Sequence, residues 1–179
     1  MAKILGNPGH DPKWGSDPGA VNNRLGIQEN TSCLAIGKIL RELAKQQGHE
    51  FYLLQHTSPS YIANFANEWG ADYFLSIHCN AYTDPSANGT ETWFCPGSVK
   101  GREMAEIMQS ELLQEFKLKD RGIKSNQSPW PKGIPILRQT YAPAILVETA
   151  FITNDNEARL IADYPERWAQ AMLRAINKF

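Results

Sequence analysis

A short apolar run in the middle of the chain, residues 73–80 (YFLSIHCN), constrains the fold most strongly. The run has the length of a strand and ends on a histidine, a cysteine and an asparagine. A segment that is apolar at nearly every position is typical of a strand covered on both faces, as in the middle of a parallel sheet. A histidine at the carboxyl end of such a strand lies where open α/β sheets bind their ligands. We therefore expect an α/β fold with a site beside His78.

Two other apolar runs end in the same way. Residues 2–5 lead into the loop that carries His10, and residues 144–147 end directly on Glu148. Because the carboxyl ends of parallel strands meet at one edge of a sheet, these polar side chains are expected to converge. The sequence thus predicts one site built from several strand ends.

Length and composition fit one ordinary globular domain. The chain has 179 residues, of which 42% are hydrophobic and 21% charged, and it carries no visible repeat or linker. A net charge of -1 gives no attraction toward nucleic acid or an anionic membrane. No apolar run approaches the roughly 18 residues of a membrane-spanning helix. We expect one domain over residues 1–179, acting as a monomer.

The three cysteines predict neither a disulfide framework nor a metal site. Cys33, Cys79 and Cys95 are odd in number and lack a CxxC spacing. Small buried apolar side chains are their expected role. On an extended chain Cys79 points to the opposite face from His78, so the two should not share a metal ion.

Hydrophobic periodicity predicts strands that alternate with helices. Helices are expected at residues 28–47, 59–69, 99–116 and from 165 onward, and strands at residues 3–5, 51–54, 73–80, 89–94, 134–137 and 144–148. Residues 6–26 and 120–133 are expected to be loops. Asn154 and Glu157 have capping-box spacing. This alternation predicts a twisted, mostly parallel sheet of about six strands, with one antiparallel member allowed, flanked by helices on both faces.

The strand-end side chains have the donor set of a catalytic zinc site, which commonly uses three protein ligands such as His₂Glu. His10 lies in a glycine- and proline-rich loop, His78 ends the central strand, and Glu29 opens the first long helix. These three are the expected ligands. Each also has an ordinary explanation, as a loop residue, a strand-end histidine and a favourable acid at a helix N-terminus. Without an HExxH pattern, spacing alone does not decide between the two.

Glu148 is expected to lie close to the interior, because four apolar residues precede it. A buried carboxylate needs a partner or has a raised pKa. Glu148 is therefore either half of a structural ion pair or a catalytic acid and base. His56 could reach the same face, but a surface or supporting position is expected for it.

The same residues lie in blocks that resemble the zinc-dependent N-acetylmuramoyl-L-alanine amidases, the cell-wall amidases of bacteria and phage endolysins. The blocks are residues 7–10 (NPGH), 17–20 (DPGA), 26–29 (GIQE), 76–81 (SIHCNA), 89–92 (GTET), 121–122 (RG) and 143–154 (PAILVETAFITN). Their order and spacing fit along nearly the whole chain. The first block departs from the usual DPGHG, since Asn7 replaces the aspartate and Asp11 follows His10, where it could orient the imidazole.

The resemblance implies one zinc ion per chain, bound by His10, Glu29 and His78, and a mixed six-stranded sheet. It implies hydrolysis of the amide that joins N-acetylmuramic acid to L-alanine in peptidoglycan. Glu148 would be the catalytic glutamate, acting first as base and then as acid. A zinc carboxypeptidase or deacetylase of cell-wall peptides, and an inactive peptidoglycan-binding module, are the alternatives.

Substrate contacts and site of action are further expectations. Asn80, Trp130 and Arg138 are expected to contact the peptidoglycan substrate. The first residues lack the apolar segment of a signal peptide. The chain is therefore expected to act on the cell wall either as an endolysin that waits in the cytoplasm or as a domain cut from an exported enzyme.

Overall fold

The computed structural model describes residues 1–10, 17–125, 129 and 131–179. Strands and helices alternate along the chain, as the hydrophobic periodicity predicts. In chain order the elements are β1 (Lys3–Pro8), β2 (Val21–Asn22), β3 (Ile27–Gln28), α1 (Glu29–Gln46), β4 (Glu50–Leu53), α2 (Pro59–Trp69), β5 (Tyr73–Asn80), β6 (Thr90–Phe94), α3 (Val99–Phe116), β7 (Asp120–Lys124), α4 (Pro135–Gln139), β8 (Ala144–Phe151), α5 (Asp155–Asp163) and α6 (Pro165–Lys178).

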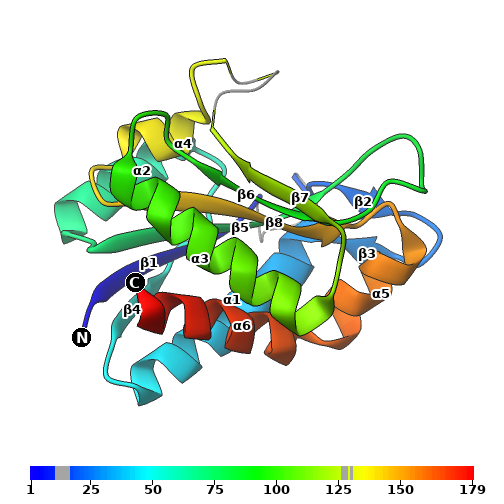
Figure 1. Cartoon of the computed structure of the whole chain (residues 1–179), viewed down its shortest axis with the longest axis horizontal. Coiled ribbons are helices and arrows are strands. Elements are labelled where there is room, and N and C mark those ends of the chain that lie inside the picture. Colours follow the sequence, from blue (N-terminus) through cyan, green and yellow to red (C-terminus); the bar gives the residue numbers. More distant parts are fainter. Residues whose placement is uncertain (11–16, 126–128, 130) are drawn as a thin grey trace.

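Six strands form one sheet in the order β4-β1-β5-β8-β6-β7 (Figure 1). The first four of these are parallel to one another. Strand β6 runs antiparallel to β8, and β7 runs parallel to β6. The predicted mixed, mostly parallel sheet is confirmed, although two strands rather than one run against the others.

Helices cover both faces of the sheet. Helices α1, α3 and α6 lie on one face, and α2 and α4 lie on the other (Figure 1). On the first face, the fully buried Trp168 of α6 stacks on Phe116 of α3, with ring centroids 3.7 Å apart. On the second face, Ile62 of α2 and Leu137 of α4 pack against Phe74 of β5. Burial on both faces explains why β5 and β8 are apolar at nearly every position.

Local sequence signals set the helix ends near the site. Ser58 caps α2 by accepting a hydrogen bond from a backbone N–H, Pro59 is its first residue, and Gly70 ends it with φ 70°. Asn154 caps α5 as predicted, since its side chain accepts from the N–H of Asn156 and of Glu157. The carboxylate of Glu157 does not complete the capping box, because it binds the backbone of Gly89 and Phe151 instead.

Two expectations about residues 120–139 were wrong. Residues 134–137 were expected to be a strand, but α4 begins at Pro135, an imino acid suited to the first helical position. Ile136 and Leu137 are consecutive and both buried. In a helix of five residues, such a pair gives the same apolar pattern as a buried strand. Residues 120–124 were expected to be a loop, but they form the edge strand β7 beside β6. Within the long loop expected at residues 6–26 lies the short strand β2, which pairs in antiparallel fashion with β3 directly after that loop.

The described helices give no candidate for a membrane span, since none combines the necessary length with the necessary apolar character.

Candidate metal centre and active site

The strand order brings the predicted site residues to one edge of the sheet. Strand β5 lies between β1 and β8, so the segments that follow these strands are neighbours. His78 of β5 lies opposite Glu148 of β8 in the register. His10 follows β1 with φ 64°, a backbone conformation uncommon outside glycine. Glu29 reaches the same place from the first turn of α1.

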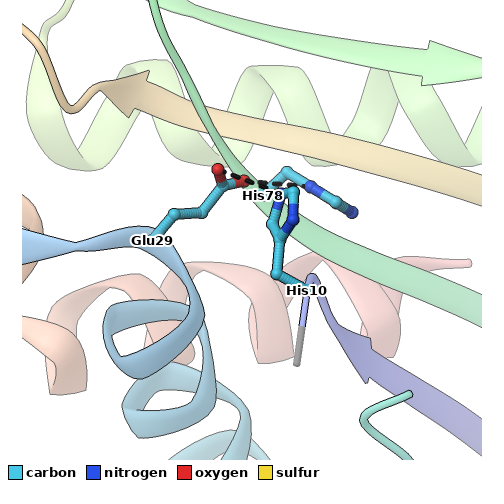
Figure 2. Close-up of side chains that lie close together, drawn as sticks. All are labelled: His10, Glu29 and His78. Carbon is cyan, nitrogen blue, oxygen red and sulfur yellow. Dashed lines mark hydrogen bonds and ion pairs between the residues drawn. The ribbon is translucent and has the colours of Figure 1, made fainter. Parts of the chain in front are cut away.

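His10, Glu29 and His78 point toward one another in the structure (Figure 2). His10 Nε2 lies 3.1 Å from Glu29 Oε2, and His78 Nδ1 lies 3.0 Å from Glu29 Oε1. One potential ligand atom from each residue lies within 4.8 Å of the other two. Two imidazoles and one carboxylate at this separation form a donor set suited to zinc.

The Glu29 carboxylate is held rigidly between the two imidazoles. Besides the histidines, its oxygens accept hydrogen bonds from the N–H of Ala20 at 2.8 Å and of Cys79 at 2.9 Å. Burial alone would raise the pKa of Glu29, but the hydrogen bonds from His10 and His78 outweigh burial and hold this pKa well below its usual range. Glu29 therefore stays ionised, which is the state that metal binding would require.

The second ring nitrogen of His10 is also fixed. His10 Nδ1 lies 2.9 Å from Asp17 Oδ1, so the carboxylate orients the imidazole and leaves Nε2 facing the site. The hydrogen bond with Glu29 raises the pKa of His10 to about 9, against the opposing effect of burial. Asp17 lies in the DPGA block, but no role was predicted for it from the sequence. Asp11, which was expected to orient the imidazole, lies outside the described residues.

Two glycines provide the room that the ligands occupy. A Cβ on Gly9 would lie 2.4 Å from His78 Cε1. A Cβ on Gly19 would lie 2.5 Å from Glu29 Oε2 and from His10 Cδ2. The backbone thus approaches all three side chains more closely than any other residue type would permit. The space, the donor set and the orientation of His10 all fit a bound zinc ion.

Glu148 lines the same groove as His10 and His78, and its carboxylate lacks a full set of partners among the described residues. Its Oε2 is buried and accepts no hydrogen bond from any described residue. Burial, followed by the negative charges of Glu29 and Glu91, raises the pKa of Glu148 well above its usual value. A structural ion pair, one of the two roles left open by the sequence, is not found for Glu148 in the described part of the chain.

Two grooves meet at Glu148. The first has a volume of about 360 Å³ and is lined by the metal-site histidines and by apolar residues such as Ile62 and Leu146. The second has a volume of about 540 Å³ and is lined by Glu91, Arg121 and other residues of β6, β7 and β8. Glu148 lines both grooves. A ligand bound beside Glu148 would therefore have room to extend in two directions.

The residues expected to contact substrate have different positions. Asn80 is half-buried and lines the second groove. Arg138 is exposed on α4 and is absent from the described linings of both grooves. Trp130 lies outside the described residues. His56 lines the first groove and stacks on Tyr61, with ring centroids 4.4 Å apart.

Cys79 turns away from the metal site, as its place beside His78 predicts. Its sulfur lies 3.7 Å from that of Cys33 in the core, and both cysteines are free. Cys95 is also free and is only partly buried.

Comparison with known proteins identifies the family of the chain. The model of the family described as N-acetylmuramoyl-L-alanine amidase matches residues 4–178. The chain belongs to this family. It is therefore an enzyme of the amidase class, and the resemblance drawn from the sequence blocks is confirmed.

Individual relatives of the amidase agree with this assignment. The chain is 37% identical to the N-acetylmuramoyl-L-alanine amidase CwlM of Bacillus licheniformis, with 99% of the chain and 70% of that protein covered. It is 36% identical to the sporulation-specific amidase of Bacillus subtilis, with 88% of the chain but only 59% of that protein covered.

A solved structure confirms the α/β fold of the amidase. The crystal structure of an N-acetylmuramoyl-L-alanine amidase from Clostridium difficile is 27% identical in sequence and superimposes with a TM-score of 0.87. The match covers 99% of this chain and 95% of that one.

Proposed function

We propose that this amidase is a zinc-dependent hydrolase that cleaves the amide between N-acetylmuramic acid and L-alanine in peptidoglycan. The observation that carries the proposal is the convergence of His10, Glu29 and His78 in a groove that Glu148 also lines, with a buried Glu148 Oε2 that no described residue hydrogen-bonds. Residues 1–179 would form one catalytic domain, which acts on the cell wall as a monomer.

His10, Glu29 and His78 would hold the zinc ion through His10 Nε2, His78 Nδ1 and a Glu29 oxygen. When bound, zinc supplies a Lewis acid that lowers the pKa of a water molecule toward about 7 and polarises the amide carbonyl. Asp17 keeps the His10 ring oriented, and the backbone N–H groups of Ala20 and Cys79 keep Glu29 in place. The chain thereby fixes the ligands before the substrate arrives.

Glu148 would move the proton. It accepts a proton from the attacking water as a carbon–oxygen bond forms at the lactyl carbonyl. It then donates that proton to the nitrogen of L-alanine as the carbon–nitrogen bond breaks. The products are a lactyl carboxylic acid on the sugar and a stem peptide with a free amino group. Burial, followed by the negative charges of Glu29 and Glu91, raises the pKa of Glu148 and so makes its carboxylate a stronger proton acceptor than an exposed one.

Mass analysis of digested peptidoglycan tests the function. Purified cell wall is incubated with the protein, with and without a chelator, and the soluble products are identified. We expect stem peptides that begin with a free L-alanine, and we expect them to disappear with the chelator. Release of a single C-terminal residue would indicate a carboxypeptidase instead, and release of acetate a deacetylase. Absence of any product would indicate a binding module.

The Glu148→Gln variant tests the proton-transfer role. It removes the titrating group and keeps the size of the side chain, so zinc content by elemental analysis should equal that of the wild type. Turnover should fall by about 100-fold or more, because general acid–base catalysis contributes on this scale. Near wild-type turnover in this variant would contradict the assignment.

A further inference from the structure

Two positively charged side chains line the second groove, and the proposed reaction does not use them. Arg121 and Lys124 both line it, on the side formed by β6 and β7. Arg121 Nε and Lys124 Nζ each lie 2.6 Å from the same atom, Glu91 Oε2. Two cations thus share one carboxylate, so this cluster of Glu91, Arg121 and Lys124 has a net charge of two minus one, or one positive charge.

The cations, rather than the carboxylate, are the groups this cluster presents to solvent. The side chain of Glu91 is 5% exposed, whereas that of Arg121 is 30% exposed and that of Lys124 is 15% exposed. The other oxygen of Glu91 accepts a hydrogen bond from the Trp93 indole at 3.0 Å. Glu91 is therefore fully engaged inside the protein and positions the two cations at the groove surface.

Among the described residues, both cations keep hydrogen-bond donors that a ligand could use. A guanidinium has five N–H donors and an ammonium has three, and the hydrogen bonds of Arg121 and Lys124 to Glu91 use only one donor each. The guanidinium lies over the Phe151 ring at 4.8 Å and the ammonium over the Trp93 ring at 5.5 Å, which fixes their positions. Two fixed cations on adjacent strands are suited to bind a carboxylate through charge-assisted hydrogen bonds.

The distribution of charge in the proposed substrate indicates which part of that substrate would enter this groove. Near the bond to be cleaved, the sugar has hydroxyl and acetamido groups but no charge, whereas the peptide carries carboxylates. The first groove, with its apolar lining, suits the uncharged sugar side. The cationic groove begins at Glu148, where the amide would be attacked, and so can receive the peptide that follows L-alanine.

We propose that Arg121 and Lys124 bind a carboxylate of the stem peptide and make the enzyme selective for stem peptides in which the residue after L-alanine has a free carboxylate rather than a carboxamide. This inference rests on the proposed function, since it assumes that the amide lies beside Glu148. It assigns Arg121 and Lys124 to substrate binding and Glu91 to positioning them.

Two muropeptides that differ in one group test the proposal. Both consist of N-acetylmuramic acid linked to L-Ala-γ-D-Glu-L-Lys; in one the α-carboxylate of the D-Glu is free and in the other it is a carboxamide. We expect kcat/KM to be about tenfold or more higher for the carboxylate form, the scale of charge-assisted hydrogen bonds. The ratio should fall as salt concentration rises, because part of the attraction is exposed to solvent.

Substitutions at Lys124 test whether this residue is the source of the selectivity. Lys124→Met keeps most of the aliphatic stem and leaves Arg121 to neutralise Glu91, and it should reduce the ratio of the two kcat/KM values toward one. Lys124→Arg should retain the preference. The matched control is Lys119→Met, which removes an equal charge from an exposed residue that is not part of the groove lining and should leave the ratio unchanged.

The outcomes separate this inference from the proposed function. Equal cleavage of both muropeptides by the wild type, or an unchanged preference in Lys124→Met, would overturn the inference and leave the amidase reaction in place. Cleavage of neither muropeptide, with no stem peptide released from cell wall, would overturn both. If Lys124→Met fails to fold, inhibition of the wild type by the two free tripeptides gives the same comparison, and equal inhibition constants would refute carboxylate recognition.

Discussion

At the scale of single residues, the Glu29 carboxylate organises the candidate metal centre. Each of its oxygens accepts one backbone N–H and faces one imidazole nitrogen, so the carboxylate cannot rotate without breaking several contacts. This explains how a loop, a helix and a strand that are distant in sequence can place three ligand atoms within 4.8 Å of one another. The fixed Glu29 carboxylate thus holds the two imidazoles in place before any ion binds.

Asp17 should be needed for full metal affinity. Its contact with His10 Nδ1 fixes the ring orientation, and loss of such partners typically weakens metal binding by about 10–100-fold. We expect this weakening in Asp17→Ala, measured by competition with a chromophoric chelator. Asp163→Ala, which changes an exposed aspartate at the end of α5, is the control. An unchanged zinc dissociation constant in Asp17→Ala would show that the His10 ring does not depend on this contact.

Gly19 and Gly26 provide a matched pair of substitutions. Both have φ 69°, so alanine imposes similar backbone strain at each, on the order of 1 kcal/mol. At Gly26 the added Cβ meets nothing within 4 Å, whereas at Gly19 it would lie 2.5 Å from Glu29 Oε2. Gly19→Ala should lose zinc and activity, and Gly26→Ala should keep both at a slightly lower melting temperature. Equal zinc content in the two variants would contradict the close fit around the ligands.

The convergence of His10, Glu29 and His78 could be predicted from sequence because His10 and His78 follow or end apolar runs and Glu29 opens a long amphipathic helix. Their role as zinc ligands stays a prediction. The cationic cluster gave no comparable signal. Glu91 is one polar residue in an alternating strand, and its partners, Arg121 and Lys124, lie in a segment whose polar composition indicated a loop. Their association depends on strand pairing, which local patterns do not specify.

At the scale of elements, the edge strand β7 and the short helix α4 were the least predictable parts. Strand β7 is polar and only partly buried, and it is defined by its pairing with β6. Helix α4 spans five residues, too few for a helical period to be distinguished from a buried strand. The long helices α1, α2 and α3 were predicted almost to the residue, because their patterns extend over several turns and have terminal signals.

Glu157 joins three elements and should contribute strongly to stability. From α5, its oxygens accept hydrogen bonds from the N–H of Gly89, before β6, at 2.8 Å and of Phe151, in β8, at 2.7 Å. Glu157→Ala would leave two buried donors unpaired, at a cost of about 2–4 kcal/mol. Urea unfolding should show a lower midpoint. Glu106→Ala, which removes an exposed i,i+4 partner of Arg102, should cost less than about 0.5 kcal/mol, and equal losses in both variants would contradict the role of Glu157.

At the scale of the whole molecule, the mixed topology gives the active site its second groove. The parallel strands β1, β5 and β8 alone would bring the strand ends and the proposed metal ligands together. Strands β6 and β7 extend the same sheet beyond β8 in the opposite direction. Their side chains therefore form a wall beside Glu148, and this wall contains the cationic cluster. The reaction and the proposed selectivity are thus properties of two different parts of one sheet.

Metal-free protein should lose stability as the pH rises from about 6.5 to about 9. The hydrogen bond with Glu29 raises the pKa of His10 from 6.5 to about 9 in the folded state. Below pH 6.5 the imidazole is charged in both states, so its interaction with Glu29 contributes in full. Between these pH values the unfolded chain has lost the proton that the folded protein keeps, and the free energy of unfolding decreases with pH. The expected loss is roughly 1–3 kcal/mol after an allowance for solvent screening.

Zinc should reverse this pH dependence for the whole molecule. A bound ion requires the unprotonated imidazole, so protons compete with zinc, and zinc-saturated protein should gain stability over the pH range in which metal-free protein loses it. Thermal unfolding from pH 6 to pH 9, in chelator and in excess zinc, measures both slopes. In chelator, His10→Gln should show a much flatter profile than the wild type, because the titrating ring is gone. Parallel slopes with and without zinc would mean that His10 does not exchange its proton for the metal, and would remove it from the ligand set.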